Sequence, residues 1–471
     1  MAKTSNVTKE YNYFEVNQDE KKKNEEETQP LQAPKLGVRH IQILAYFLLV
    51  LIAFGFRVSL SVAIVAMTDS NINNSTNIPI YPEWKEKNLI LSAFFWGYII
   101  PQVIAGWAAG KFGAKWLLIA PFTVQCLLAF LMPFTAARFG SMGLIVSRSL
   151  QGFCQGHIFP SLTHLLSRWV PQQERAFLGS IVFAASSLGT VLAIAITGVI
   201  AASSYGWPLV FYGNGILGFL WVVIFIFVGY DSPANHPWIS EAEKQYADAP
   251  YKTPWKSIMT SLPVWALLVS QTGNNYCFWT LLTQIPTYMN YVMHFNIKSN
   301  SLLSALPYLT LWIFSFFVGY ISDLIVNKRL ISITTSRKIF NTIGLCVPAL
   351  ALVILAFISP DQKTQAVILL IFAVSFNAAV FAGWGVNHMD LAPNNAGTLM
   401  GICNGFSQIT GAAAPLVVQS IVIDESDILQ WRKVFLITAG FNVITSLIFD
   451  IFGSGKPQPW SGHERKEEAK A

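Results

Sequence analysis

Twelve long apolar runs, separated by polar segments, constrain this chain more than any other feature of its sequence. Six of them lie at 41–67, 89–109, 116–135, 142–169, 177–201 and 208–229, and six more at 262–293, 300–324, 338–358, 365–388, 397–423 and 433–453. A helix needs about 20 apolar residues to cross a bilayer. Only helices and closed barrels satisfy their backbone groups in lipid, and these runs lack the alternation of barrel strands. The sequence therefore predicts an all-α integral membrane protein with twelve transmembrane helices in two six-helix bundles.

The composition excludes a soluble enzyme. Of the 471 residues, 53% are hydrophobic and only 12% are charged, whereas about 25% of an ordinary soluble domain is charged. All five cysteines lie within apolar runs, which argues against an extracellular disulfide framework. The net charge of +6 is spread over short loops and tails rather than gathered in one basic patch, so we expect no nucleic-acid partner.

Polar segments divide the chain into five parts. We predict a disordered cytosolic tail over 1–39, a first bundle over 40–229, a cytosolic linker over 230–258, a second bundle over 259–453 and a cytosolic tail over 454–471. With both termini in the cytosol, most of the 31 Lys and Arg residues fall on the inner side, as the positive-inside rule requires. Asn73 and Asn74 in the first outer loop begin overlapping N-glycosylation acceptors, and the alternative is an unmodified polar loop.

The two halves of the chain repeat each other. Residues 106–115 (GWAAGKFGAK), after the second run, correspond to 319–329 (GYISDLIVNKR), after the eighth. Residues 207–211 (WPLVF) likewise correspond to 431–435 (WRKVF), and Pro171 with Gly179 matches Pro393 with Gly401. A parallel repeat of six plus six helices predicts two bundles packed around a central cavity.

Two arginines, Arg57 and Arg148, lie inside apolar runs. A charge at the bilayer centre costs about 2.5–3.5 kcal/mol, and the sequence has no acidic residue between Glu86 and Glu174 to offset it. We interpret both side chains as a site for a transported anion, because guanidinium groups bind carboxylate or phosphate in a bidentate way. The alternative is that one or both extend to the outer surface or bond helix-end carbonyls.

Polar neutral residues within the runs are further candidates for the cavity wall. Gln151 and Gln155 share a helical stripe with Arg148. In the second half we select Asn274, Asn275, Tyr276 and Asn387, whose alternative role is bonding between helices. His164 is a candidate proton carrier, although a histidine on that side of a helix is by default a packing residue.

A cluster of charges follows the eighth run. Asp323 lies close in sequence to Lys328, Arg329, Arg337 and Lys338. We interpret Asp323 with Arg337 as a gating latch, since an ion pair between helices at the mouth of the cavity favours one orientation. The alternative is a solvated loop charge. In the first half Gly110 stands at the position of the Asp, so the latch is asymmetric.

Several segments together resemble the anion/cation symporter family of the major facilitator superfamily, which includes sialin, the vesicular glutamate transporters and the type I sodium-phosphate cotransporters. They are RVSLSVAIV from Arg57, FFWGYI from Phe94, RSLQG from Arg148, DSP from Asp231, HPWIS from His236, SLPVWA from Ser261, LLTQIPTYM from Leu281 and NHMDLAP from Asn387. The resemblance covers roughly residues 40–460. It implies an alternating-access carrier of organic anions or phosphate, driven by protons or sodium, in which the arginines at the positions of Arg57 and Arg148 serve substrate binding and transport.

This chain departs from the family pattern at positions linked to proton coupling. Gln155 stands where proton-coupled relatives carry Glu, and the family's histidine in that span aligns with Thr163 rather than His164. Leu91 and Asn274 replace the His and Arg of the vesicular glutamate carriers. These departures argue against vesicular glutamate loading and favour sodium coupling or a facilitated route.

We therefore predict a secondary active transporter of organic anions or inorganic phosphate that is not an enzyme. The alternatives are an uncoupled anion facilitator and a non-transporting receptor or scaffold of the same fold. No cofactor or metal is expected beyond a co-transported sodium ion or proton. We expect a monomer whose partners are a small anionic substrate and the bilayer of a plasma, lysosomal or vesicular membrane.

Overall fold

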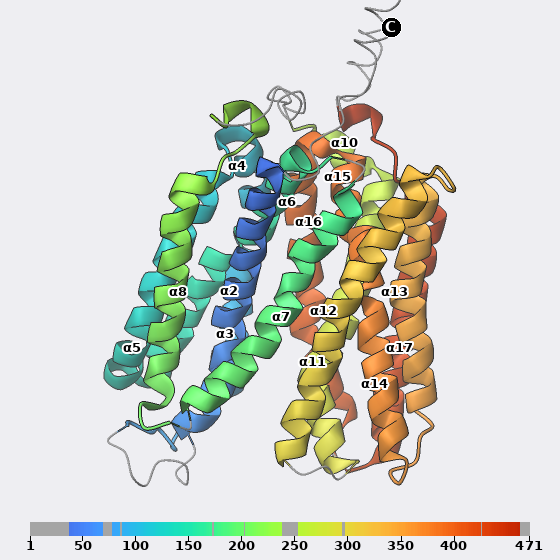
Figure 1. The fold of residues 1–471 in the computed structure, drawn as a ribbon. Helices are drawn as coiled ribbons and strands as arrows, with labels where there is room; N and C mark the ends of the chain where they lie inside the picture. Colours follow the sequence, from blue (N-terminus) through green and yellow to red (C-terminus); the bar gives the residue numbers. More distant parts are fainter. Residues whose placement is uncertain are drawn as a thin grey trace, which may run out of the picture.

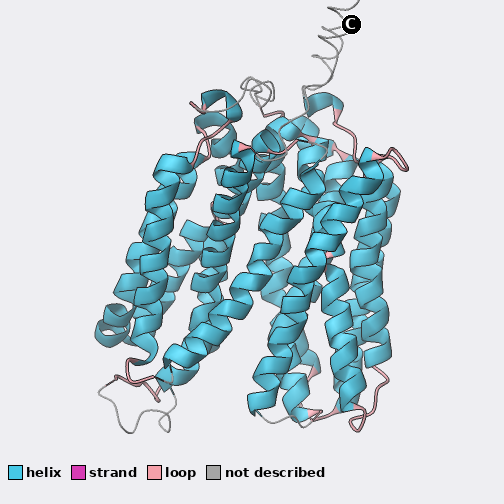
Figure 2. Cartoon of the chain, viewed as in Figure 1, coloured by secondary structure: helices cyan, strands magenta, loops and turns pink. Residues whose placement is uncertain are grey.

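A computed structural model describes residues 37–68, 78–84, 87–171, 174–201, 203–237, 253–293, 297–424 and 426–461. The predicted glycosylation sites Asn73 and Asn74, together with 1–36, 238–252 and 462–471, lie outside the described residues. Throughout the described part the regular structure is helical, without strands (Figure 2).

The first half of the chain forms six membrane-spanning segments. Their helices are α2 (Val38–Thr68), α3 (Lys87–Ile99), α4 (Gln102–Phe112), α5 (Lys115–Gln155), α6 (Ile158–Trp169), α7 (Arg175–Ala201) and α8 (Gly206–Val228). One span is interrupted at Ile100 and Pro101, between α3 and α4, because proline cannot donate to the helical ladder. Another is interrupted at Gly156 and His157, between α5 and α6.

Helix α5 holds two antiparallel spans rather than one long helix. Gly140 has φ 59° and ψ −148°, a backbone conformation that glycine adopts easily. On either side of it, Ser147 Oγ donates to Thr135 Oγ1 at 3.4 Å. In a straight helix two residues 12 positions apart would be separated by about 18 Å. The chain therefore turns back at Gly140, between the runs that the sequence places at 116–135 and 142–169.

The second half also forms six spans. Its helices are α11 (Leu262–Tyr291), α12 (Ile297–Asn327), α13 (Ile333–Leu355), α14 (Lys363–Asn377), the π-type turn η3 (Phe381–Gly385), α15 (Val386–Leu391), α16 (Ala396–Ile421) and α17 (Ile428–Phe452). One span consists of α14, η3 and α15, and its backbone is irregular at Gly383. Shorter helices η2 (Pro233–Asn235), α10 (Trp255–Thr260), η4 (Pro393–Asn395) and η5 (Pro459–Ser461) lie between or after the spans.

The helices account for the twelve predicted spans. Among the described residues, nine helical segments are long and apolar enough to cross a membrane. One of the nine, Lys115–Trp169, contains the reversal at Gly140 and so supplies two spans. Helices α11 and α16, with 30 and 26 residues, are long enough but carry several amide side chains. The all-α fold with twelve transmembrane helices is thus confirmed.

Helices α2–α8 and α11–α17 form two groups that lie side by side (Figure 1). A chain of contacts brings the two described ends of the protein to the same end of the bundles. Arg39 pairs with Glu174, the next residue Arg175 pairs with Asp390, and Asn387 donates to the carbonyl oxygen of Ser454. We call this the termini end and the other the opposite end.

The two halves meet in closely packed helix pairs, α7 with α12 and α16 with α4 and α6. A Cβ atom on Gly106 would lie 2.1 Å from the carbonyl oxygen of Gly397, so α4 and α16 touch backbone to backbone. A Cβ atom on Gly319 would lie 2.9 Å from Cα of Phe177 in α7. Gly106 and Gly319 are equivalent positions of the sequence repeat. The repeat therefore builds the same contact twice, and we call these contacts the seam.

Candidate functional site

A cavity of about 100 Å³ lies between the two halves, lined by side chains from both. The first half contributes Phe54, Arg57, Phe159, Phe183, Ser186 and Ser187, and the second half Gln271, Asn274, Asn275, Phe278, Trp279, Leu311, Asn377, Phe381, Trp384, Gly385, Met400, Asn404 and Gln408. Among the described residues, the lining includes Arg57 and no carboxylate. The cavity wall is therefore aromatic and amide-rich, with a single positive charge.

Arg57 is held by aromatic rings instead of by an acid. Its guanidinium carbon lies 4.6–5.6 Å from the centroids of five rings, which belong to Phe54, Phe94, Phe95, Tyr98 and Trp279. The side chain is only 8% exposed, and its Nε and Nη2 atoms have no hydrogen-bond partner in the described part of the chain. None of the ion pairs between described residues involves it.

Such a guanidinium is suited to an anionic ligand. Aromatic faces attract a cation by about 2 kcal/mol or more when water is excluded, but they leave its in-plane N–H groups without acceptors. Carboxylate and phosphate oxygens match the geometry of two parallel N–H groups. Trp279 comes from α11 in the second half and also contacts Phe95 edge to face, with centroids 5.0 Å apart. Arg57 thus lies where aromatic side chains from both halves meet.

Arg148 occupies a different environment, although it is also buried, at 2% exposure. Its Nη1 atom donates to the carbonyl oxygen of Phe56 and to Oε1 of Gln151, and Nη2 donates to the carbonyl oxygen of Arg57. Gln155 Nε2 donates to the carbonyl oxygen of Ala53. The predicted stripe of polar residues on α5 therefore faces the backbone of α2, and none of its three members lines the cavity.

The second-half candidates divide into two groups. Asn274 and Asn275 line the cavity. Tyr276 points elsewhere and packs on Phe441, with ring centroids 5.3 Å apart. Asn387 lies near the termini end, where its Nδ2 atom donates to the carbonyl oxygen of Ser454. Neighbouring positions on one helix face different directions, which explains why Asn275 and Tyr276 separate.

Sequence reasoning missed four amide side chains of the cavity: Gln271, Asn377, Asn404 and Gln408. Spacing provided a signal for three of them. Gln271 precedes Asn274 and Asn275 by three and four residues, and Asn404 precedes Gln408 by four, so each set shares a helix face in an otherwise apolar run. Asn377 has no other amide three or four residues away in its run, so spacing gives no such signal for it.

His164 lies in the seam and not in the cavity lining. It is buried in α6, and a Cβ atom built on Gly397 would lie 3.0 Å from the Cβ atom of His164. Its Nδ1 atom has no hydrogen-bond partner among the described residues. These contacts place His164 where α6 of the first half packs on α16 of the second.

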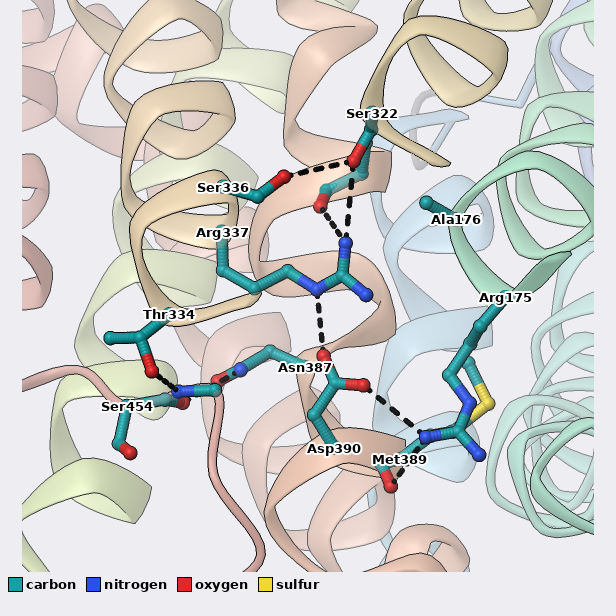
Figure 3. A network of polar contacts seen from close by, with 12 residues as sticks. Arg175, Ala176, Ser322, Thr334, Ser336, Arg337, Asn387, Met389, Asp390 and Ser454 are labelled. Atoms are coloured by element: carbon teal, nitrogen blue, oxygen red, sulfur yellow. Dashed lines mark hydrogen bonds and ion pairs between the residues drawn. The ribbon is translucent and has the colours of Figure 1, made fainter. Parts of the chain in front are cut away.

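An ion-pair cluster joins the halves near the termini end (Figure 3). Asp390 is 1% exposed and accepts from Nε of Arg337 at 2.7 Å and from Nη1 of Arg175 at 3.2 Å. Arg337 belongs to α13 of the second half, and Arg175 begins α7 of the first. Arg337 also donates to the Ala382 carbonyl and to Ser322 Oγ. The partner of Arg337 is thus Asp390, which lies 53 residues away in sequence.

Asp323 also joins the two halves, through a different kind of contact. Its carboxylate accepts the backbone N–H groups of Ala176 at 3.1 Å and Phe177 at 2.7 Å, in the first turn of α7. Helix N-termini carry partial positive charge and unpaired N–H groups, which a carboxylate stabilises. Asp323 therefore contacts the first half through a helix end and not through the basic residues that follow it in sequence. Asp390 and Arg175 were missed because an acid and a base near helix ends look like solvated loop charges.

Comparisons with known proteins agree with this architecture. A family model described as the Major Facilitator Superfamily matches residues 43–415. Two solved structures share the fold. The proton:xylose symporter has a TM-score of 0.68 and 15% identity, and the match covers 88% of this chain and 96% of that one. The Escherichia coli fucose:proton symporter has a TM-score of 0.62 and 12% identity, and the match covers 87% of this chain and 98% of that one.

Relatives found by sequence have a higher sequence identity to this chain than these two structures have. A candidate inorganic phosphate cotransporter of Drosophila ananassae is 36% identical over 89% of this chain and 93% of its own length. Sialin of Homo sapiens is 35% identical over 90% of both chains, and vesicular glutamate transporter 1 of Xenopus tropicalis is 34% identical over 89% of this chain and 75% of its own. The superfamily consists of transporters, so the expectation that the chain is not an enzyme is confirmed. The chain belongs to the major facilitator superfamily, in the group that holds sialin, the vesicular glutamate transporters and the inorganic phosphate cotransporters.

Proposed function

We propose that this chain is a cation-coupled, alternating-access carrier of a small organic anion or inorganic phosphate, with Arg57 as the group that binds the anion. One observation carries the proposal: Arg57 lines the central cavity, two of its guanidinium nitrogens have no hydrogen-bond partner, and no acid is paired to it among the described residues. A buried charge without a counterion is expensive. A bound anion supplies that counterion.

Arg148 supports this site from behind. Three donated hydrogen bonds join it to the carbonyls of Phe56 and Arg57 and to Gln151, which fixes the turn of α2 that presents Arg57. This geometry favours a positioning role over direct contact with the substrate. A positioning role also agrees with the family resemblance, which implies that the arginine at this position serves substrate binding and transport.

The seam and the ion-pair cluster act as the gate at the termini end. By the positive-inside rule we assign this end to the cytosol. Asp390 between Arg337 and Arg175, and Asp323 on the first turn of α7, both bridge the halves. Opening the cavity to the cytosol requires these bonds to break, and all of them are formed in the structure. The same orientation places Asn73 and Asn74 outside the cytosol, in the lumen of a lysosome or vesicle or at the cell surface.

Coupling to sodium fits the cavity better than coupling to protons. Moving one negative charge into a cell costs about 2.3 kcal/mol per 100 mV of inside-negative potential, and a symported cation offsets this. Arg57 is the single ionisable side chain in the cavity lining that the structure describes. His164, the candidate proton carrier, lies in the seam instead.

Uptake by purified protein in liposomes tests the proposal. Sialate, phosphate, urate and acidic amino acids are offered while sodium and pH gradients are imposed separately. We expect saturable uptake of at least one anion, stimulated by a sodium gradient, and loss of that uptake in Arg57→Ala with expression unchanged. Arg57→Lys should recover little, because an ammonium cannot form the two parallel bonds of a guanidinium. Full uptake by Arg57→Ala contradicts the assigned role, and binding without flux identifies a receptor.

A further inference from the structure

The chain continues past α17 and lies against the termini end of the second half. The carbonyl oxygen of Ser454 accepts a hydrogen bond from Asn387 Nδ2 at 2.8 Å, and Gly455 N donates to Thr334 Oγ1 at 2.9 Å (Figure 3). A Cβ atom on Gly455 would lie 2.8 Å from the backbone nitrogen of Thr334, so the segment touches the start of α13 directly. We call residues 454–461 the C-terminal strap.

The far part of the C-terminal strap is also bonded to the second half. Gln458 N donates to the carbonyl oxygen of Leu391 at 2.9 Å, and the carbonyl oxygen of Ser461 accepts from Asn394 Nδ2 at 3.2 Å. The side chain of Trp460 packs against a buried apolar cluster that includes Leu391. Because all of these contacts are made to the second half, they need not break when the two halves separate.

The two helices that the strap joins carry the second-half members of the ion-pair cluster. Thr334 precedes Arg337 by three residues in α13, and Asn387 precedes Asp390 by three residues in α15. Residues three apart lie on the same side of a helix. The bonds of the strap therefore lie beside the 2.7 Å contact between Arg337 Nε and Asp390 Oδ2 (Figure 3).

Helix α15 depends on such outside contacts. It has only six residues, and isolated helices shorter than about 12 residues are marginal in water. It follows the irregular turn at Gly383 and ends at Ala392, whose φ of −153° and ψ of 83° are not helical. The strap bonds both ends of α15: Asn387 lies in its first turn, and Leu391 is its last residue. The bond to Leu391 also pairs a carbonyl group that a helix leaves free at its C-terminus.

We infer that the C-terminal strap positions Asp390 for closure of the gate. It holds α15 against α13, so the carboxylate already lies beside Arg337 when Arg175 of the first half approaches. The inference rests on the gate of the proposed function and adds a segment to it. A group that is already held in place loses less freedom when it forms a further bond. Without the strap, the halves should separate more readily at the termini end.

Distances between spin labels test the inference on the full-length protein in liposomes. The labels are attached to Lys111→Cys and Lys328→Cys, exposed positions in different halves, on a background without native cysteines. Gly455→Ala places a methyl group against the backbone of α13 and so displaces the strap. Thr334→Val removes the hydroxyl that accepts from Gly455 N and keeps the shape of the side chain. Each variant should raise the population with long label distances about twofold or more.

Two comparisons separate positioning of Asp390 from a general effect on packing. Gly440→Ala is the matched control, because a Cβ atom there meets nothing within 4 Å, and it should leave the distances unchanged. If the strap acts through Asp390, Gly455→Ala should change the distances much less on an Asp390→Asn background than alone, since residues of one network are not additive. The maximal rate of uptake should fall while the Km of the anion changes little, because residues 454–461 do not line the cavity.

The outcomes decide the inference separately from the proposed function. Unchanged label distances in Gly455→Ala and Thr334→Val overturn it, even where Tm falls. Additive effects of Gly455→Ala and Asp390→Asn also overturn it, because the strap then acts independently of the ion pair. Unchanged distances in Asp390→Asn itself overturn the gate and the inference together. If the wild-type protein takes up no anion, the proposed function fails, and the label distances, which need no substrate, still decide the inference.

Discussion

The Nη2 atom of Arg148 donates to the backbone carbonyl of Arg57 at 2.9 Å, so the two membrane arginines are neighbours with different tasks. Arg57 lines the cavity and has two buried nitrogens without a hydrogen-bond partner among the described residues, whereas Arg148 is bonded to the backbone of the helix that carries Arg57. The first guanidinium lacks hydrogen-bond acceptors at two nitrogens, and the second is solvated by peptide dipoles. Their substitutions should therefore change stability in opposite directions.

Arg57→Met should abolish anion uptake and raise the Tm of the ligand-free protein by a few degrees. The substitution removes a buried charge without a counterion and keeps an apolar side chain among the five aromatic rings. Fluorescence-detected unfolding of purified protein measures Tm, and liposome uptake measures transport. A marked fall in Tm would show that the guanidinium is structural.

Arg148→Met should lower Tm and the rate of uptake together. It removes three donated bonds, two of them to carbonyls of α2, and hydrogen bonds from charged donors contribute about 1.5–3 kcal/mol each. The expected loss of transport is partial, with the Km of the anion changed less than the maximal rate. An unchanged Tm with a greatly raised Km would instead place Arg148 in contact with the substrate.

Asp390→Asn should open the gate at the termini end. The neutral amide cannot balance both Arg175 and Arg337, and breaking a buried ion pair costs about 3–5 kcal/mol. Spin labels on Lys111→Cys and Lys328→Cys, two exposed positions in different halves, report the separation on a background without native cysteines. We expect a longer distance distribution in Asp390→Asn. Asp361→Asn, an exposed acid, is the control and should leave the distances unchanged.

Gly110→Asp should strengthen the same closure. Asp323 caps α7, and the repeat gives Gly110 the equivalent position in α4, the helix that packs on α16; a Cβ atom there would meet nothing within 4 Å. A second cap should slow turnover and shorten the distance between the labels. Gly110→Ala provides the control, because it adds helix propensity without a charge. Faster turnover in Gly110→Asp than in Gly110→Ala would contradict this reading.

Sequence patterns were sufficient to predict the fold and to identify Arg57 as a charge inside a span with no acid paired to it among the described residues. Apolar run length located the spans, including the reversal at Gly140, because the bilayer imposes a length on every helix. The charge of Arg57 stood out because no acid lay near it in sequence. Both features are local or compositional, and therefore visible without coordinates.

The contacts between residues that are distant in sequence could not be predicted from such local patterns. Periodicity grouped Arg148, Gln151 and Gln155 correctly on one stripe, but it cannot say whether a stripe faces the cavity or a neighbouring helix. Asp390 pairs with Arg175 across 215 residues, and nothing in either local sequence indicates the other. Asn404 of the cavity lining donates to Tyr98 and Gln102, which lie 306 and 302 positions away in sequence.

The backbone contact of Gly106 with Gly397 determines how this end of the molecule can open. Where a side chain blocks a passage, a single rotamer change can admit a water molecule or an ion. Two glycines in contact have no rotamers, so a passage forms only when whole helices separate. The barrier on this side should thus be impermeable to small ions until the halves move as bodies, which is what preserves an ion gradient in a coupled carrier.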